Sequence, residues 1–140
     1  MRKILIPTMA LLLAGCVNDS ASYYIDGRDH ALTLLRAQKY FWSDAATLTL
    51  VVARLPECQR RHELTLAPAA SVDIDLFAGA DASWTLRSTS TLWRVDTATC
   101  AISAGGAGGA DALGERVGSF KVVDQRLRFA MDRPAALPAK

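Results

Sequence analysis

Hydrophobic and polar side chains alternate with a period of two along most of the chain between residues 47 and 129. Such alternation is typical of β-strands that turn one face to a core and the other to solvent. Seven strands are predicted in this way, with inward positions at Leu48/Leu50, Leu64/Leu66, Val72/Ile74/Leu76, Trp84/Leu86, Trp93/Val95, Phe120/Val122 and Leu127/Phe129. Turn-forming residues separate them at 56–57, 67–68, 79–81, 88–90 and 124–125. The pattern predicts an all-β, mostly antiparallel domain, either a small β-sandwich or a partly open barrel.

The segment over residues 30–42 fits two secondary structures. A helix would align Leu32 with Leu35 in an incomplete apolar stripe, whereas a strand would place Leu32, Leu34 and Arg36 on one side. We favour the strand, because the neighbouring segments are predicted strands.

Three regions are expected beyond the N-terminal signal described below. They are a lipidated N-terminus and tether over residues 16–30, the β-domain over residues 31–131 and a flexible tail over residues 132–140. Within the tether, Tyr23, Tyr24 and Ile25 are expected to form a first edge strand before a turn at Asp26-Gly27.

The first residues of the chain have the zones of a secretory signal. Arg2 and Lys3 provide a positive start, and an almost unbroken apolar run follows from Ile4 to Leu13. The twelve residues from Ile4 to Gly15 would span about 18 Å as a helix, well short of the ~30 Å hydrocarbon core of a bilayer. We therefore expect a signal peptide over residues 1–15 rather than a permanent membrane span.

The signal ends in Leu13-Ala14-Gly15-Cys16, which resembles the lipobox of bacterial lipoprotein precursors. In that class the cysteine sulfur receives a diacylglycerol, a peptidase cuts directly before the cysteine, and the new amino group is often acylated as well. Two or three acyl chains hold a protein firmly at a membrane. The resemblance implies lipid on Cys16. Because Val17 stands where an Asp retains enterobacterial relatives in the inner membrane, it also implies an outer-membrane protein that faces the periplasm.

The charge of the mature chain is expected to make no strong field for nucleic acid or acidic lipid. Among 140 residues, 16 are Lys or Arg and 14 are Asp or Glu. Loss of Arg2 and Lys3 with the signal would leave equal numbers of both signs. A neutral domain makes no strong field for nucleic acid, so we expect no nucleic-acid partner.

The two remaining cysteines, Cys58 and Cys100, are expected to form a disulfide, since an exported compartment is oxidising. Closing a loop of 42 residues would stabilise the fold by about 4 kcal/mol in the chain-entropy model. The alternative is a redox or metal-binding pair, which lacks the usual CxxC spacing and a nearby pair of histidines.

Arg60, Arg61 and His62 follow Cys58 in a segment that we predict to be a hairpin connection. Three hydrogen-bond donors close together could hold a phosphate, a carboxylate or a lipid headgroup. The simpler interpretation is a solvated turn that the disulfide holds in place.

Five large aromatic residues are expected to pack mainly in the core, where each buries ~150–250 Å². They are Tyr40, Phe41, Trp42, Trp84 and Trp93. If Trp42 were exposed, it would instead indicate contact with a partner or a glycan.

The sequence contains no motif for catalysis, metal binding or a cofactor, and we expect none of these. Asp73 and Asp75 share one face of a predicted strand about 7 Å apart, but a Ca²⁺ site needs about six to eight oxygens. His30 and His62 are the two histidines, and neither belongs to an HExxH motif. The glycine-rich residues 104–114 lack the lysine of a phosphate-binding loop and are expected to form a flexible hairpin loop.

Residues 56–62 and the overall layout resemble small uncharacterised lipoproteins of proteobacteria, which implies no mechanism. We expect a non-catalytic, membrane-anchored envelope lipoprotein that binds or supports another envelope component, through an edge strand or an exposed apolar patch. One alternative is a module that binds a small anionic ligand or a glycan through Arg60, Arg61 and Trp42. Another is a hydrolase built around one of the two histidines.

Overall fold

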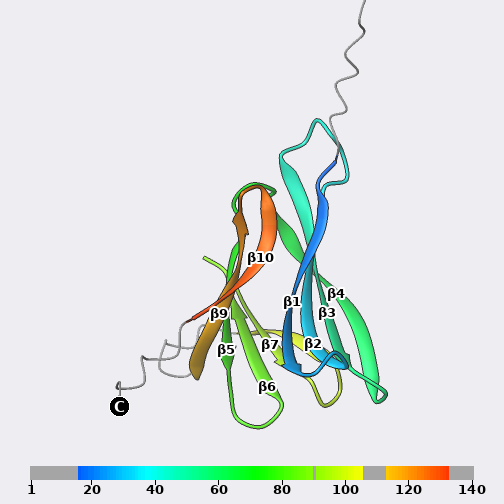
Figure 1. The fold of residues 1–140 in the computed structure, drawn as a ribbon, viewed down its shortest axis with the longest axis vertical. Helices are drawn as coiled ribbons and strands as arrows, with labels where there is room; N and C mark the ends of the chain where they lie inside the picture. Colours follow the sequence, from blue (N-terminus) through cyan, green and yellow to red (C-terminus); the bar gives the residue numbers. More distant parts are fainter. Residues whose placement is uncertain (1–15, 90, 106–112, 133–140) are drawn as a thin grey trace, which may run out of the picture.

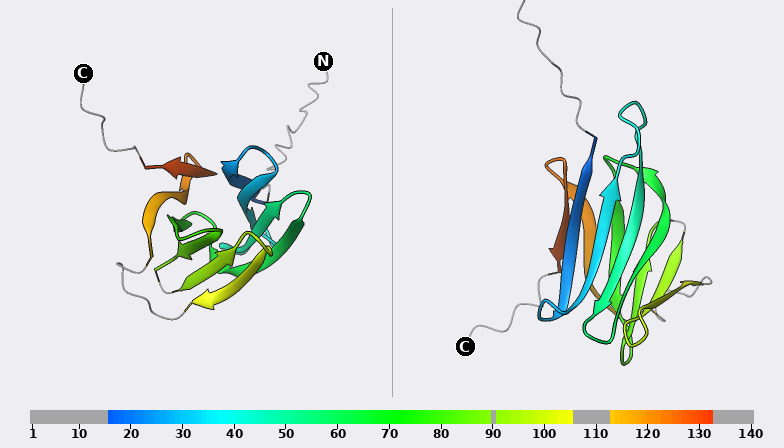
Figure 2. Two further views of the ribbon diagram at one scale, coloured as in Figure 1. Left: turned by 90° about the horizontal axis from the view of Figure 1, so that it is seen from below. Right: turned by 90° about the vertical axis from the view of Figure 1, so that its right-hand side faces the viewer.

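The computed structural model describes residues 16–89, 91–105 and 113–132, which form ten strands in two antiparallel sheets (Figure 1). The two sheets face each other and do not close into a barrel (Figure 2). The fold class predicted from the alternation is therefore confirmed. Within the described ranges, no helix is long and apolar enough to cross a membrane.

The strands follow one another in each sheet by hairpin pairing, with one longer connection in the second sheet. The four-stranded sheet has the order β1 (Asn18–Asp26), β2 (His30–Ala37), β3 (Ala45–Arg54) and β4 (Cys58–Pro68). The six-stranded sheet has the order β10 (Arg126–Met131), β9 (Glu115–Val123), β5 (Asp73–Ala78), β6 (Ser83–Arg87), β7 (Leu92–Asp96) and β8 (Ala101–Gly105).

The core lies between the facing sheets and consists of most of the predicted inward residues; Leu66 is an exception, since it is 66% exposed. From the four-stranded sheet come Leu32, Leu34, Leu48, Leu50 and Val52, and from the six-stranded sheet come Ile74, Leu76, Trp84, Leu86, Trp93, Val95 and Phe120. Successive residues of a strand point to opposite faces, so a strand in which polar and apolar residues alternate turns one face to solvent and the other to the core.

The ambiguous segment over residues 30–42 divides into two parts. Its first part is the strand β2, which pairs with β1 on one side and β3 on the other. The strand interpretation is thus confirmed for residues 30–37. Residues 38–44 form the loop between β2 and β3.

Two expectations about strand boundaries were wrong. The edge strand expected at residues 23–25 is present, but it extends back through most of the expected tether as the nine-residue strand β1, in which Ala21 is buried and the Ser22 and Thr33 hydroxyls are hydrogen-bonded at 2.7 Å. Small polar residues have low strand propensity, and pairing with β2 outweighs it here. The expected hairpin connection around residues 60–62 is part of β4, because the turn occupies residues 55–57 instead.

One strand was not predicted. β8 consists of Ala, Ile, Ser, Ala and Gly, so it lacks the alternation of large apolar residues that identifies other strands. It pairs with β7 at the edge of the six-stranded sheet. The loop expected over residues 104–114 is not a hairpin loop, because the strands on either side of it, β8 and β9, are not neighbours in the sheet. Its first two residues belong to β8, and residues 106–112 lie outside the described residues, as do the predicted signal peptide and residues 133–140 of the predicted tail.

The turn between β9 and β10 is a tight hairpin turn. Asp124 and Gln125 both have positive φ, at 51° and 64°. Two such residues in succession match the right-handed twist of a tight hairpin. The turn places the carbonyl of Gln125 over the start of β1, where it reaches the site described next.

Candidate functional site

Cys16 is exposed at the end of the sandwich where β1 begins. It is the free cysteine of the described residues, because the other two form a disulfide. Val17, the next residue, is held by Gln38 through two hydrogen bonds. The backbone amide of Gln38 donates to the Val17 carbonyl at 2.7 Å, and the backbone amide of Val17 donates to Gln38 Oε1 at 3.2 Å. The cysteine is therefore presented to solvent directly beside an ordered strand.

An ion pair between Asp19 and Arg36 fastens the start of β1. Arg36 Nε and Nη2 donate to the two carboxylate oxygens of Asp19 at 2.9 and 2.7 Å. Arg36 also donates from Nη1 to the Ala69 carbonyl and from Nη2 to the Gln125 carbonyl, the latter at 3.1 Å. Asp19 in turn accepts a bond of 2.9 Å from the Leu127 amide. The ion pair thus connects both sheets across the edge where β1 meets β10.

The electrostatics of this ion pair follow from its burial. The Arg36 side chain is only 2% exposed and that of Asp19 is 28% exposed. Burial by itself raises the pKa of the Asp19 carboxyl. The hydrogen bonds from Arg36 and from the Leu127 amide, with the charges of Arg36 and Arg126, outweigh it and hold the pKa below its ordinary 3.8. Asp19 is therefore ionised and matches the charge of a buried guanidinium that would be costly alone.

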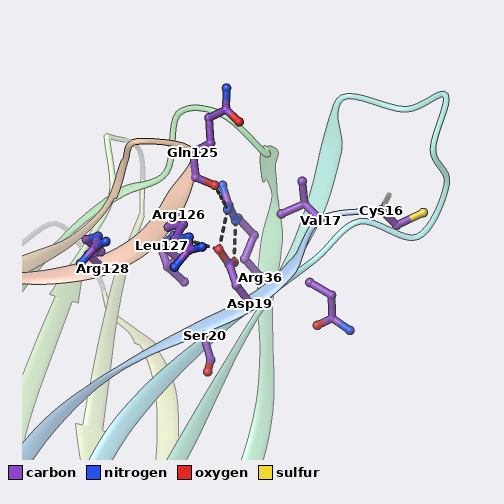
Figure 3. Close-up of a pocket in the computed structure, with 10 residues that line it drawn as sticks. Cys16, Val17, Asp19, Ser20, Arg36, Gln125, Arg126, Leu127 and Arg128 are labelled. Carbon is purple, nitrogen blue, oxygen red and sulfur yellow. Dashed lines mark hydrogen bonds and ion pairs between the residues drawn. The ribbon is translucent and has the colours of Figure 1, made fainter. Parts of the chain in front are cut away.

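A groove of about 590 Å³ runs from Cys16 along β1 to the β9–β10 hairpin (Figure 3). Its walls include the ion pair together with Arg126 and Arg128, which are exposed. A neighbouring cavity of about 730 Å³ shares Val17 and Arg36 with it. Both cavities therefore lie at the Cys16 end of the molecule.

The aromatic residues expected in the core divide into two groups. Trp84 and Trp93 are buried at 9% and 6% exposure, as predicted. Tyr40, Phe41 and Trp42 are not core residues, since they lie in the β2–β3 loop with exposures of 43%, 65% and 70%. A short apolar run looks the same in sequence whether it faces a core or a surface, so alternation could not separate the two cases.

The donors predicted at residues 60–62 do not converge on one point. Neighbouring residues of a strand point to opposite sides, so Arg60 and Arg61 in β4 diverge, and both are exposed. They pair with Val52 and Val51 near the far end of β3, whereas Trp42 precedes its beginning. The fold therefore does not bring these arginines and Trp42 together into the ligand-binding site considered as an alternative.

The far edge of the sandwich is closed by the predicted disulfide. Cys58 at the start of β4 is bonded to Cys100 just before β8, with Cα atoms 6.0 Å apart. His62 Nε2 lies 2.8 Å from the Cys100 carbonyl oxygen, so this histidine supports the same corner. The role of His62 visible here is structural, and the disulfide links the two sheets on the side opposite the ion pair.

The acidic pair considered for calcium is used otherwise. Asp75 accepts hydrogen bonds from Arg87 at 2.9 Å and from Arg116 at 3.0 Å, while Asp73 is exposed. Burial raises the pKa of Asp75, but the two arginines lower it below 3.8. Within the described ranges, no group of three His, Cys, Asp or Glu could hold a metal ion. His30, whose buried Nε2 has no hydrogen-bond partner, lines none of the cavities described above.

The Asp19–Arg36 ion pair was missed by sequence reasoning, although one signal pointed to it. The strand alternative for residues 30–42 placed Arg36 in phase with Leu32 and Leu34. A charged residue at an inward position requires a buried partner, but nothing in the pattern identified Asp19 as that partner.

No family model, curated protein or solved structure matches this chain in the comparisons.

Proposed function

We propose that this protein is a lipoprotein of the bacterial cell envelope, anchored in the outer membrane through lipid on Cys16 and facing the periplasm. The observation that carries the proposal is the position of Cys16. Its thiol is free and exposed, and the next residue, Val17, is held to Gln38 by two hydrogen bonds. A sulfur at this point is accessible to a modifying enzyme without unfolding β1, and the lipobox residues Leu13-Ala14-Gly15 precede it. The disulfide fits an oxidising compartment.

The domain is proposed to bind or support another envelope component without catalysing a reaction. Support comes from β4, which is an edge of the four-stranded sheet. Its first half carries Arg60, Arg61 and Glu63, and charges of this kind discourage indiscriminate strand pairing. Its second half is uncharged, and Leu66 there is 66% exposed. An extended segment of a partner could pair with this half and cover Leu66.

The anchoring proposal is tested by metabolic labelling of cells with a fatty acid. The wild-type protein should be labelled and Cys16→Ser should not, because the acyl group is attached to that sulfur. Cys58→Ser is the matched control and should keep the label. An unlabelled wild-type protein, with Cys16→Ser still in the same envelope fraction, would contradict the proposal.

The binding role is tested separately by a photoreactive amino acid at position 66 of β4. A partner that pairs with this edge should be cross-linked from position 66 in cells. Because this substitution leaves Glu63 in place, the charge of the edge is unchanged. The matched control is the same amino acid in place of Tyr24, which is 59% exposed on β1. If neither position, or both equally, yields a defined cross-linked species, the edge-pairing role is wrong.

A further inference from the structure

The loop between β2 and β3 presents three aromatic rings to solvent. In this aromatic loop (residues 38–44), the rings of Tyr40 and Trp42 are stacked with centroids 4.8 Å apart. The Phe41 ring meets Trp42 edge-on at 4.9 Å. The rings thus pack on one another, and none of them belongs to the core cluster. The loop that carries them projects beyond the sheets at one end of the molecule (Figures 1 and 2). Large exposed apolar groups of this kind mark a surface that is covered in the working protein.

The aromatic loop is tied to the residue next to Cys16. The paired hydrogen bonds between Gln38 and Val17 join the base of the loop to the start of β1. The side chain of Gln38 also donates to the Ser43 carbonyl and so holds the other end of the loop. Figure 3 shows the loop passing beside Cys16. One residue spans at most about 3.6 Å, so Cys16 cannot move far from the loop.

We infer that the aromatic loop inserts into the interfacial layer of the same bilayer that holds the lipid on Cys16. This inference rests on the proposed anchoring. Acyl chains on Cys16 must enter the membrane directly at Cys16, which brings the adjoining loop to the membrane surface. Trp and Tyr concentrate at membrane–water interfaces, because each ring is largely apolar but carries one polar group.

The charge next to the rings suits the same surface. Lys39 Nζ lies 5.2 Å from the centroid of the Tyr40 ring. A lysine beside an interfacial aromatic can lay its stem along apolar surface and direct its ammonium to lipid phosphates. The lipid on Cys16 and the aromatic loop would then form two neighbouring contacts with the membrane. Together they would orient the sandwich with the turn at residues 55–57 directed away from the bilayer.

Tryptophan fluorescence can test the insertion, because the three tryptophans differ sharply in exposure. Trp42 is 70% exposed, whereas Trp84 and Trp93 are buried. The lipidated protein, extracted from membranes, is reconstituted into phosphatidylcholine–phosphatidylglycerol vesicles whose acyl chains carry bromine, a contact quencher. Wild-type emission should be quenched and shifted to shorter wavelength, with quenching several-fold greater than in Trp42→Phe.

A matched control moves the exposed tryptophan to the other end of the sandwich. Tyr24 lies six residues after the start of β1, about 20 Å along the strand. The double variant Trp42→Phe/Tyr24→Trp should therefore show an exposed tryptophan that bromine does not quench. Equal quenching of the control and the wild-type protein would overturn the inference.

The outcomes separate the loop from the anchor. A protein that is fatty-acid labelled and floats with the vesicles, but whose Trp42 is no more quenched than in Trp42→Phe, would overturn the insertion alone. If that Trp42 were also shielded from aqueous acrylamide, the loop would instead contact a second copy of the chain. A protein that is unlabelled and does not float would overturn the anchoring, and the insertion with it.

Discussion

Replacing Asp19 with alanine should destabilise the sandwich by about 3 kcal/mol. Removing one partner of a buried ion pair costs about 3–5 kcal/mol, because it leaves the other charge uncompensated. Here Arg36 would keep the carbonyls of Ala69 and Gln125 but lose both bonds to carboxylate oxygen, and the Leu127 amide would lose its acceptor. Since the Asp19 side chain is 28% exposed, water can replace part of what is lost. The lower end of the range is therefore expected.

Urea denaturation of the oxidised protein measures this change. With a denaturant slope of about 2 kcal/mol per molar, the midpoint should fall by about 1.5 M. Arg36→Met should also destabilise, and Asp19→Ala/Arg36→Met should cost less than the sum of the single changes by about 2 kcal/mol, because the double variant leaves no unpaired charge. The matched control is Asp73→Ala, which removes an exposed aspartate and should change stability by no more than about 0.5 kcal/mol.

The cycle can refute the reasoning in two ways. A cost of less than about 1 kcal/mol for Asp19→Ala would mean that the pair behaves as an exposed surface pair. Additive costs in the double variant would mean that Asp19 and Arg36 act independently, whatever their distance.

Two further predictions concern the disulfide and the second acidic cluster. Cys58→Ser/Cys100→Ser should lower the free energy of unfolding by about 4 kcal/mol, because a 42-residue loop is no longer closed in the unfolded chain; an unchanged urea midpoint would contradict this. The arginines Arg87 and Arg116 hold the pKa of Asp75 below 3.8, so the unfolded chain takes up a proton first as the pH falls. The stability that the ionised Asp75 provides is fully present above about pH 5, and it is lost as the pH falls through the lowered pKa of the folded state. In urea titrations at successive pH values, Asp75→Asn should lose less stability on acidification than the wild-type protein, and parallel curves would contradict the assignment.

The core was predictable because strand alternation depends only on local chemistry. Leu48, Leu50, Ile74 and Leu76 are all almost fully buried. Each is recognisable from its immediate neighbours, since a period of two with apolar residues on one phase admits few other structures. The disulfide was predicted on separate grounds, since the two cysteines outside the lipobox would pair in the oxidising compartment expected for an exported domain.

The Cys16 end was not predictable for an equally physical reason. Arg36 is bonded to Asp19 17 residues earlier and to Gln125 89 residues later. No local pattern encodes such a meeting, which depends on how the two sheets are laid together. The exposure of Trp42 could not be predicted either, since it depends on whether the β2–β3 loop folds back on the core, and the local pattern of residues does not reveal this.

The two edges of the sandwich are joined by different chemistry, and the difference matters at Cys16. The disulfide closes the edge far from the cysteine, whereas the ion pair closes the edge three residues after it. Edge strands fray from their ends unless something fastens them. Asp19→Ala should therefore loosen the start of β1 and accelerate hydrogen exchange of the Gln38 amide, which donates to the Val17 carbonyl.

Serine at both disulfide positions should raise exchange at that amide only as far as global stability falls, because the disulfide does not touch this edge. Exchange measured under conditions where the two variants are matched in global stability separates local fraying from unfolding. If the Gln38 amide exchanges equally in both, the ion pair contributes to the whole fold but does not fasten the start of β1. Faster exchange in Asp19→Ala alone would make the buried ion pair the element that keeps Cys16 and the aromatic loop in a fixed relation.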